Sequence, residues 1–284
     1  MNPVYEKVLK NLRKANAKAK LVMAKNYGFD TVEAFEKFLT TDPASNPNPP
    51  APNPTTRKKA DKKVAIAVPP MMHNVHILDA SMSMRDYNKI GNALEGINSE
   101  IRELKANPDV LYITNTLVHF AGTGDIKTAC WKLKMSEAKD DFSFAPRGWT
   151  ALYEAIGVTL EKLLAEHKDG EKVLVKIFTD GEENSSAKKW KANQYPPTPS
   201  EGLKALIKLC KEKEFLITFV GTQVDVDKIV KDLPIDKSNT LVHDNSAAGV
   251  KASFKKSIGA TVSYRAATAG GQSVMENFFV DPNE

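Results

Sequence analysis

The sequence predicts an α/β fold in which a doubly wound, mostly parallel sheet has helices on both faces. Short apolar runs alternate with amphipathic helical segments between residues 75 and 258, and this alternation is typical of an open parallel sheet. Two strand-like runs follow each other across residues 121–125, which contain two glycines, and this spacing predicts one antiparallel edge strand. Hydrophobic residues make up 42% of the chain, which is enough to build such a core.

Six short runs rich in Val, Ile, Leu and Phe predict the strands, because β-branched and aromatic residues suit a pleated surface. We expect strands over 75–78, 110–120, 126–133, 172–178, 215–220 and 240–242. Five longer segments carry apolar residues at steps of three and four, which predicts helices. We expect helices over 87–104, 151–166, 200–214, 226–232 and 247–258. Ligands of such folds bind at the carboxyl ends of the strands, so the loops there are where chemistry is expected.

A smaller unit precedes the sheet. Residues 1–42 predict a helical hairpin, in which Asp30 and Glu33 have the spacing of a capping box. Six of the twelve residues 43–54 are proline, so residues 43–66 are predicted to form an extended, semi-rigid linker with a basic end. The hairpin either packs on the main domain or offers a docking surface.

The main domain is predicted to cover residues 67–262, and residues 263–284 are predicted to form a C-terminal tail. The tail is rich in Ala, Gly and Ser. Its apolar triplet at 278–280 either docks on a neighbouring protein or packs on its own domain.

The positive charge of the chain is concentrated at its N-terminal end. The net charge is +5, yet residues 1–65 hold thirteen Lys and Arg against six Asp and Glu. The remaining residues hold 27 against 29 and are slightly acidic. The basic segment gives nucleic-acid binding some support through phosphate contacts. A solvated linker and helix face is the favoured interpretation.

The sequence predicts neither a membrane span nor a secreted, disulfide-bonded protein. No apolar run approaches the roughly 18 residues that cross a bilayer. The N-terminal segment is polar and basic, without the apolar stretch of a signal peptide. Cys130 and Cys210 are expected to be reduced, buried thiols. We therefore expect a cytoplasmic protein, or a phage-encoded one in the host cytoplasm or the virion.

Three loops carry side chains that suit a metal ion. Asp79, Ser81 and Ser83 follow the first strand at steps of two, so their oxygens can point the same way from an extended turn. Thr150 stands at a helix start behind a glycine, and Asp180 ends another strand. Oxygen donors of this kind suit a hard cation such as Mg²⁺.

This combination resembles the von Willebrand factor A (VWA) domain with its metal-ion-dependent adhesion site (MIDAS), over about residues 70–260. All five positions of the family's site are present: Asp79, Ser81 and Ser83 of DxSxS, the isolated Thr150, and Asp180 of TDG. The resemblance implies a Rossmann-like VWA fold and bound Mg²⁺, with Mn²⁺ or Ca²⁺ as alternatives. It also implies that the hydroxyls reach the ion, that the aspartates act largely through water, and that a partner's carboxylate completes the coordination.

The surface around this site is the predicted contact with a partner protein. Long loops beside a site often determine specificity, and residues 181–199 form such a loop unless they are a plain insertion. The predicted partner contacts are Trp149, Glu182, Lys188 and Trp190.

We expect a binding protein and not an enzyme. Glu182 and Glu183 follow Asp180, but we interpret them as solvated loop residues, whereas metal-ion hydrolysis needs a general base beside a bound water. Neither a phosphate-binding glycine loop nor a nucleophile elbow occurs. The favoured function is an intracellular adaptor that binds an acidic residue of a partner through the cation. The alternatives are a structural or assembly component, including a phage virion protein, and a nucleic-acid-associated protein.

Overall fold

The computed structural model describes residues 31–33, 36–37 and 68–279. The chain divides into two units, residues 1–68 and 69–284. In the first unit, residues 32–33 and 36–37 are helical. The rest of the predicted hairpin and the predicted linker lie outside the described residues. The second unit contains the sheet and the candidate site.

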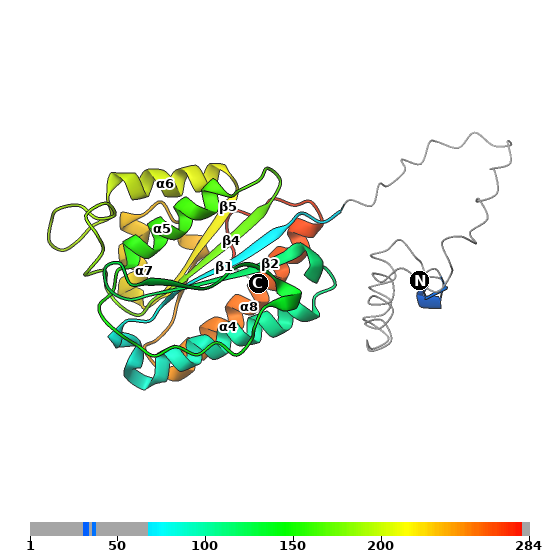
Figure 1. The fold of residues 1–284 in the computed structure, drawn as a ribbon, viewed down its shortest axis with the longest axis horizontal. Helices are drawn as coiled ribbons and strands as arrows, with labels where there is room; N and C mark the ends of the chain where they lie inside the picture. Colours follow the sequence, from blue (N-terminus) through cyan, green and yellow to red (C-terminus); the bar gives the residue numbers. More distant parts are fainter. Residues whose placement is uncertain (1–30, 34–35, 38–67, 280–284) are drawn as a thin grey trace. The chain divides into compact units, whose positions relative to one another are not determined.

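Within residues 68–279, six strands form one sheet in the order β3-β2-β1-β4-β5-β6 (Figure 1). Neighbouring strands run parallel except at one edge, where β3 pairs antiparallel with β2. The strands are β1 (Met72–Asp79), β2 (Ile113–Phe120), β3 (Ile126–Lys134), β4 (Lys172–Phe178), β5 (Phe215–Gly221) and β6 (Thr240–Val242). The predicted mostly parallel sheet with one antiparallel edge strand is confirmed.

Helices cover both faces of this sheet, as Figure 1 shows. On one face lie α4 (Lys89–Ala106) and α8 (Ala247–Ala269), side by side. The other face is covered by α5 (Leu152–Ala165), α6 (Glu201–Glu212) and α7 (Gln223–Asp232). Short 3-10 helices connect some of these elements, namely η2 (Met82–Asn88), η3 (Val110–Tyr112), η4 (Met135–Glu137) and η5 (Lys237–Asn239). The sheet is therefore doubly wound, as predicted.

The first strand and the first helix of the domain differ from their predicted bounds. β1 begins at Met72, three residues before the predicted start. The prediction left out Asn74 because it is polar, but its side chain is buried in the strand and donates a hydrogen bond of 2.9 Å to Glu100. α4 begins later, because Tyr87 and Asn88 have φ values of 52° and 53°. This left-handed conformation does not fit within an α-helix. The chain therefore turns sharply between the strand and the helix.

The last helix is longer than predicted and takes in the first part of the predicted tail, residues 263–284. Arg265 accounts for the extension, because its side chain is buried and its Nη1 donates to the carbonyl oxygen of Pro70 at 2.7 Å. Beyond the helix, Phe278 and Phe279 are also buried. Of the two alternatives for this apolar end, the structure favours packing on its own domain.

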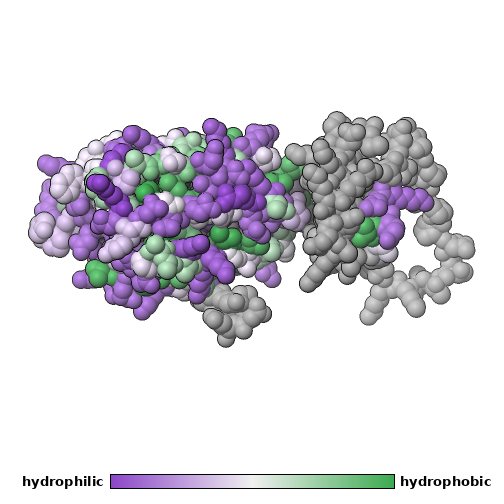
Figure 2. All heavy atoms as spheres, turned by 90° about the horizontal axis from the view of Figure 1, so that it is seen from below, coloured by the Kyte–Doolittle hydropathy of each residue, from purple (hydrophilic) through white to green (hydrophobic). Residues whose placement is uncertain are grey.

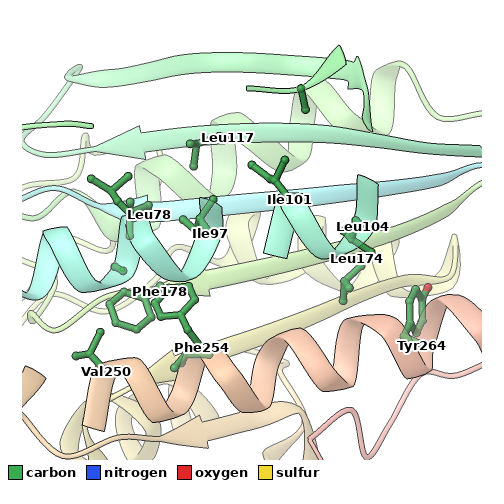
Figure 3. Packing of buried hydrophobic residues seen from close by; sticks show 14 of the residues in the cluster. Leu78, Ile97, Ile101, Leu104, Leu117, Leu174, Phe178, Val250, Phe254 and Tyr264 are labelled. Atoms are coloured by element: carbon green, nitrogen blue, oxygen red, sulfur yellow. The ribbon is translucent and has the colours of Figure 1, made fainter. Parts of the chain in front are cut away.

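The core consists of two apolar layers, one on each face of the sheet. In the first layer, Leu78 and Phe178 of the sheet face Ile97 of α4 and Phe254 of α8 (Figure 3). The ring centroids of Phe178 and Phe254 are 4.9 Å apart. The second layer lies between the sheet and α5, α6 and α7. Each large apolar side chain that is fully buried contributes about 1.5–3 kcal/mol to stability, so both faces hold the strand ends in place.

A charged cluster is enclosed within the first layer. Glu100 of α4 and Lys176 of β4 form an ion pair in which neither side chain is more than 5% exposed. Lys176 also donates to the Thr261 hydroxyl at 3.1 Å, and His76 Nε2 lies 3.3 Å from Glu100 Oε1. Burial alone would raise the pKa of Glu100, but Lys176 and His76 outweigh burial and hold that pKa below its ordinary value. Burial, and after it Lys176, lowers the pKa of His76.

The surface over α4 and α8 is mainly hydrophilic, with hydrophobic residues in small groups (Figure 2). Across the part of the chain that the structure describes, no helix combines the length and apolar character that a bilayer span requires. Cys130 and Cys210 are both free thiols. Cys210 is buried, as predicted, whereas Cys130 is only partly buried.

Candidate metal-binding site

Several loops meet at the carboxyl ends of the central strands and are joined by backbone hydrogen bonds. Ala80, just after β1, donates to the carbonyl of Phe120 at 2.8 Å and accepts from the N–H of Arg147 at 2.8 Å. Met82 donates to the carbonyl of Gly148 at 3.3 Å. The loops after β1 and β2 and the segment before α5 are therefore held together by their main chains.

Arg147 fixes the segment before α5 a second time through its side chain. Its Nε and Nη2 donate to the two carboxylate oxygens of Asp125 at 2.6 and 3.0 Å. Such bidentate pairs restrict geometry as well as adding energy. The loop that carries Thr150 is thereby tied to the β2–β3 hairpin.

Asp79, Ser81 and Ser83 form one side of the site. Oδ1 of Asp79 accepts the backbone N–H of Ser81 at 2.7 Å, and Oδ2 accepts the hydroxyl of Thr179 at 2.5 Å. The hydroxyl oxygens of Ser81 and Ser83 are 2.9 Å apart. The spacing of two residues therefore places the two hydroxyls side by side, while Asp79 holds the turn that carries them.

Asp180 and Thr150 extend this group of oxygens. The Ser83 hydroxyl donates to Oδ1 of Asp180 at 2.8 Å. A β-carbon added at Gly181 would lie 3.0 Å from Ser83 Oγ and 3.3 Å from Thr150 Oγ1. The same atom would lie 3.7 Å from Asp79 Oδ2. Oxygens from three separate loops therefore converge next to Gly181, and a larger residue there would crowd them.

The donor atoms fit a hard divalent cation. They are hydroxyl and carboxylate oxygens, which suit Mg²⁺, Mn²⁺ or Ca²⁺ better than softer metals. Nowhere in the described residues, this site included, do three or more His, Cys, Asp or Glu side chains form a group that could hold a metal ion, so the site depends on Ser and Thr hydroxyls for most of its donors. Burial raises the pKa of Asp79 to about 7, although hydrogen bonds from Thr179 and Ser81 oppose the shift. A positive charge at the site would favour the ionised form of this carboxyl.

Lys89, which the motif does not predict, is part of the site. Its Nζ lies 2.5 Å from Oδ2 of Asp180, and the two side chains are 4% and 0% exposed. Asp180 thus has a donor on each oxygen, Ser83 on Oδ1 and Lys89 on Oδ2. The sequence contains a signal for this contact. Lys89 stands four residues before Ala93 and eight before Ile97, on the buried face of α4, where a charged residue needs a partner.

The segment after Asp180 supports Thr150 from the other side. The side-chain oxygen of Asn184 accepts the N–H of Thr150 at 2.9 Å, and the carbonyl of Thr150 accepts the N–H of Asn184 at 3.0 Å. This reciprocal pair fixes the backbone at the start of α5, so the Thr150 hydroxyl is presented from a rigid turn.

Glu183 departs from its predicted role. The prediction of a solvated loop residue is wrong, because Glu183 is buried and accepts three hydrogen bonds. The donors are the N–H of Tyr153 at 3.0 Å, the N–H of Ser186 at 2.7 Å and the hydroxyl of Ser186 at 2.6 Å. Glu182 is exposed, as predicted. Glu183 therefore anchors the loop to α5.

The predicted partner contacts divide into exposed and buried residues. Trp149 is 72% exposed, and Glu182 and Lys188 are exposed as well. Trp190 is only 4% exposed, so the prediction that it contacts a partner at the surface is wrong. The reason is Gly157 on α5. A β-carbon there would lie 2.2 Å from Cε3 of Trp190, so the glycine makes room for the indole ring.

Solved structures resemble this chain in fold, and one of them is a vWF domain. The pilus adhesin SpaC from Lactobacillus rhamnosus GG matches with a TM-score of 0.55 and 14% sequence identity, over 67% of this chain and 30% of the adhesin. The vWF domain of the type V pili tip protein Mfa5 from Porphyromonas gingivalis matches with a TM-score of 0.51 and 9% identity. That match covers 70% of this chain and 97% of the Mfa5 domain.

These likenesses show the fold of the chain, which is that of a VWA domain. The chain spans less than a third of the length of SpaC. No protein-family model and no curated protein sequence matches the chain.

Proposed function

We propose that this protein is an interaction module that binds a carboxylate of a partner protein through a divalent cation. The proposed cation is Mg²⁺, with Mn²⁺ or Ca²⁺ as alternatives. Its proposed ligands are Asp79, Ser81, Ser83, Thr150 and Asp180. The observation that carries this proposal is the convergence of oxygens next to Gly181 from the loops of Asp79 and Ser83, of Thr150 and of Asp180.

The chemistry of the donors explains why such a cation would accept a further ligand from a partner. Hydroxyls are neutral and donate little charge, so a cation that they hold remains attractive to an anion. Asp and Glu carboxylates are hard oxygen donors of the kind that Mg²⁺ prefers. Trp149 and Met82, which neighbour the site residues in sequence, are 72% and 46% exposed. With the exposed Glu182 and Lys188, they supply the surface that a partner would contact.

A binding role agrees better with the surroundings of the site than a catalytic one. A metal-dependent hydrolase needs a general base that can take a proton from a metal-bound water. Glu183 has its carboxylate occupied by three donors. Glu182 is an exposed loop residue. We therefore propose docking, and not hydrolysis, as the function of the site.

The same site would serve a cytoplasmic adaptor or a subunit of a larger assembly. The two settings differ in the identity of the partner and in the state of the protein in solution. Light scattering of the full chain with Mg²⁺ separates them, because an adaptor is expected as a discrete species and an assembly component as larger particles.

Thermal unfolding of the full chain in Mg²⁺ and in EDTA tests the proposal. Ligand binding stabilises the folded state by about 2.7 kcal/mol at a hundred times Kd, so Mg²⁺ should raise the Tm of the wild type. Thr150→Val removes one hydroxyl at constant shape and should abolish this Mg²⁺-dependent increase. Thr159→Val is the matched control, since its buried hydroxyl has no hydrogen-bond partner in the structure. The proposal would be contradicted if the Tm of the wild type were the same in Mg²⁺ and in EDTA and a separate binding measurement detected no bound Mn²⁺.

A partner found in a host lysate must meet the same criteria. It should be retained by the wild type and by Thr159→Val in Mg²⁺, released by EDTA, and not retained by Thr150→Val. Retention that persists in EDTA would show that the contact does not use the cation.

A further inference from the structure

Lys89 occupies a position where a lysine has two separate costs. It is the first residue of α4, where the positive end of the helix dipole disfavours a cation. It is also 3% exposed, and burial of a charge is costly unless the charge is paired. Its ion pair with Asp180 offsets these costs. The role of Lys89 is therefore expected to lie in its effect on Asp180.

The charges of the site change when Lys89 is included. Two ionised aspartates, Asp79 and Asp180, balance a divalent cation, so the loaded site would be neutral without the lysine. With the Lys89 ammonium on Asp180 Oδ2, the ion, the two aspartates and the lysine together have an excess of one positive charge. Like charges in a poorly solvated site repel strongly. The lysine therefore opposes the cation, and the excess charge attracts an anion.

We propose that Lys89 is a specificity residue that weakens cation binding and strengthens the binding of a carboxylate to the loaded site. This inference rests on the proposed function and concerns the partner class that the same site selects. Asp180 is shared between an internal cation and the divalent ion. The loaded site is then held firmly only when a negatively charged group of the partner cancels the extra charge. Partners with an Asp or Glu side chain are selected over neutral oxygen donors.

The test compares the full-length wild type with Lys89→Met and Lys89→Gln. Mn²⁺ affinity is measured from the electron paramagnetic resonance signal of free Mn²⁺. Acetate affinity of the Mn²⁺-loaded protein is then measured by water proton relaxation at constant ionic strength. Both variants should bind Mn²⁺ more tightly, by about tenfold or more, because a nearby positive charge is removed. Both should bind acetate several-fold more weakly than the wild type.

Lys105→Met is the matched control for the loss of one positive charge. Lys105 lies on the same helix and pairs with Asp140 at 3.4 Å in a partly exposed contact. Sixteen residues of α-helix separate it from Lys89, about 24 Å, which is more than two Debye lengths at physiological salt. Mn²⁺ and acetate affinities of this variant should equal those of the wild type.

The opposite signs of the two effects distinguish this role from a structural one. If Lys89 only held the loops in place, its loss would loosen the site and lower both affinities, and that result would overturn the inference. An unchanged Mn²⁺ affinity or an unchanged acetate affinity would overturn it as well, while the proposed function would stand. If neither the wild type nor any variant binds Mn²⁺, the proposed function fails together with the inference. Circular dichroism melts in EDTA establish that each variant is folded, and Lys89→Gln keeps a polar group beside Asp180.

Discussion

Two buried ion pairs, each between a carboxylate and a lysine, lie in different parts of this molecule. Glu100 and Lys176 meet between the sheet and the helices α4 and α8, and Asp180 and Lys89 meet at the carboxyl ends of the strands. In both pairs neither side chain is more than 5% exposed. The first pair is surrounded by further interior groups, whereas the second lies beside hydroxyls that converge next to Gly181.

The difference shows that the surroundings of a buried ion pair, and not its burial, indicate its role. A buried pair is weak evidence for stability, because the cost of removing two charges from water can equal their attraction. The enclosed pair contacts only interior groups such as His76 and Thr261, so its role is in the fold. The pair at the strand ends includes a carboxylate that a divalent ion would also use. The following experiments test this contrast, from the largest expected effect to the smallest.

Lys176→Met should have the largest effect on stability. It leaves Glu100 as a buried charge without its cation, which typically costs about 3–5 kcal/mol. Urea denaturation in EDTA measures the loss as a lower unfolding free energy at unchanged m-value. Lys176→Met combined with Glu100→Leu should recover most of the loss, since neither charge remains. If the unfolding free energy of Lys176→Met were within about 1 kcal/mol of the wild-type value, the distinction between the two pairs would be wrong.

Acidification should weaken the fold through His76 of the enclosed cluster. The folded-state pKa of His76 lies below its ordinary value, because of burial and then Lys176. The unfolded chain therefore takes up a proton that the folded chain does not, and stability falls as the pH drops below about 6.5. One such proton contributes at most about 1.4 kcal/mol per pH unit.

Urea denaturation between pH 7.5 and 5 of the wild type and His76→Gln measures this contribution. Other histidines add to the wild-type slope, so the difference between the two proteins is the tested quantity. The variant should show the shallower dependence. Equal slopes in both proteins would mean that His76 does not take part in the coupling.

Gly181→Ala should affect the metal site and leave the enclosed cluster unchanged. The new β-carbon would lie 3.0–3.3 Å from Ser83 Oγ and Thr150 Oγ1, so the oxygens must move apart by a few tenths of an ångström. We expect Mn²⁺ affinity to fall about tenfold, which corresponds to about 1.4 kcal/mol, with little change in unfolding free energy in EDTA. Gly259→Ala is the control, because its β-carbon would meet nothing within 4 Å. If Gly181→Ala bound Mn²⁺ as tightly as the wild type, the oxygens beside Gly181 would not be the ligands of the ion.

Glu95→Gln should have the smallest effect on the unfolding free energy. It provides the value for an exposed ion pair with which the buried pairs are compared. Glu95 accepts from Arg102 at 2.6 Å on the outer face of α4, and their side chains are 63% and 47% exposed. Exposed pairs of this kind contribute about 0–1 kcal/mol. The unfolding free energy in urea should therefore change by less than about 1 kcal/mol. A loss as large as that of Lys176→Met would show that exposure does not separate the pairs.

The sequence predicts the features that depend on local spacing. The alternation of strands and helices predicts the sheet, and the step of two between Ser81 and Ser83 predicts that their hydroxyls are neighbours. Local spacing indicates that a buried lysine such as Lys89 needs a partner, but it does not identify a partner that is distant in the sequence. Lys89 and Asp180 are 91 residues apart, and the burial of Trp190 depends on the lack of a side chain at a glycine of another element. Such contacts depend on how the elements pack, which a linear pattern does not contain.

The bond between Arg265 and Pro70 has a consequence for the order in which the protein is synthesised. The two residues are 195 positions apart, so roughly 10–40 s of translation separate them at about 5–20 residues per second. Until α8 emerges, the part of α4 and of the sheet that α8 covers in the folded protein has no cover. The nascent chain therefore exposes apolar surface for that time, and Phe278 and Phe279 complete the cluster on that face.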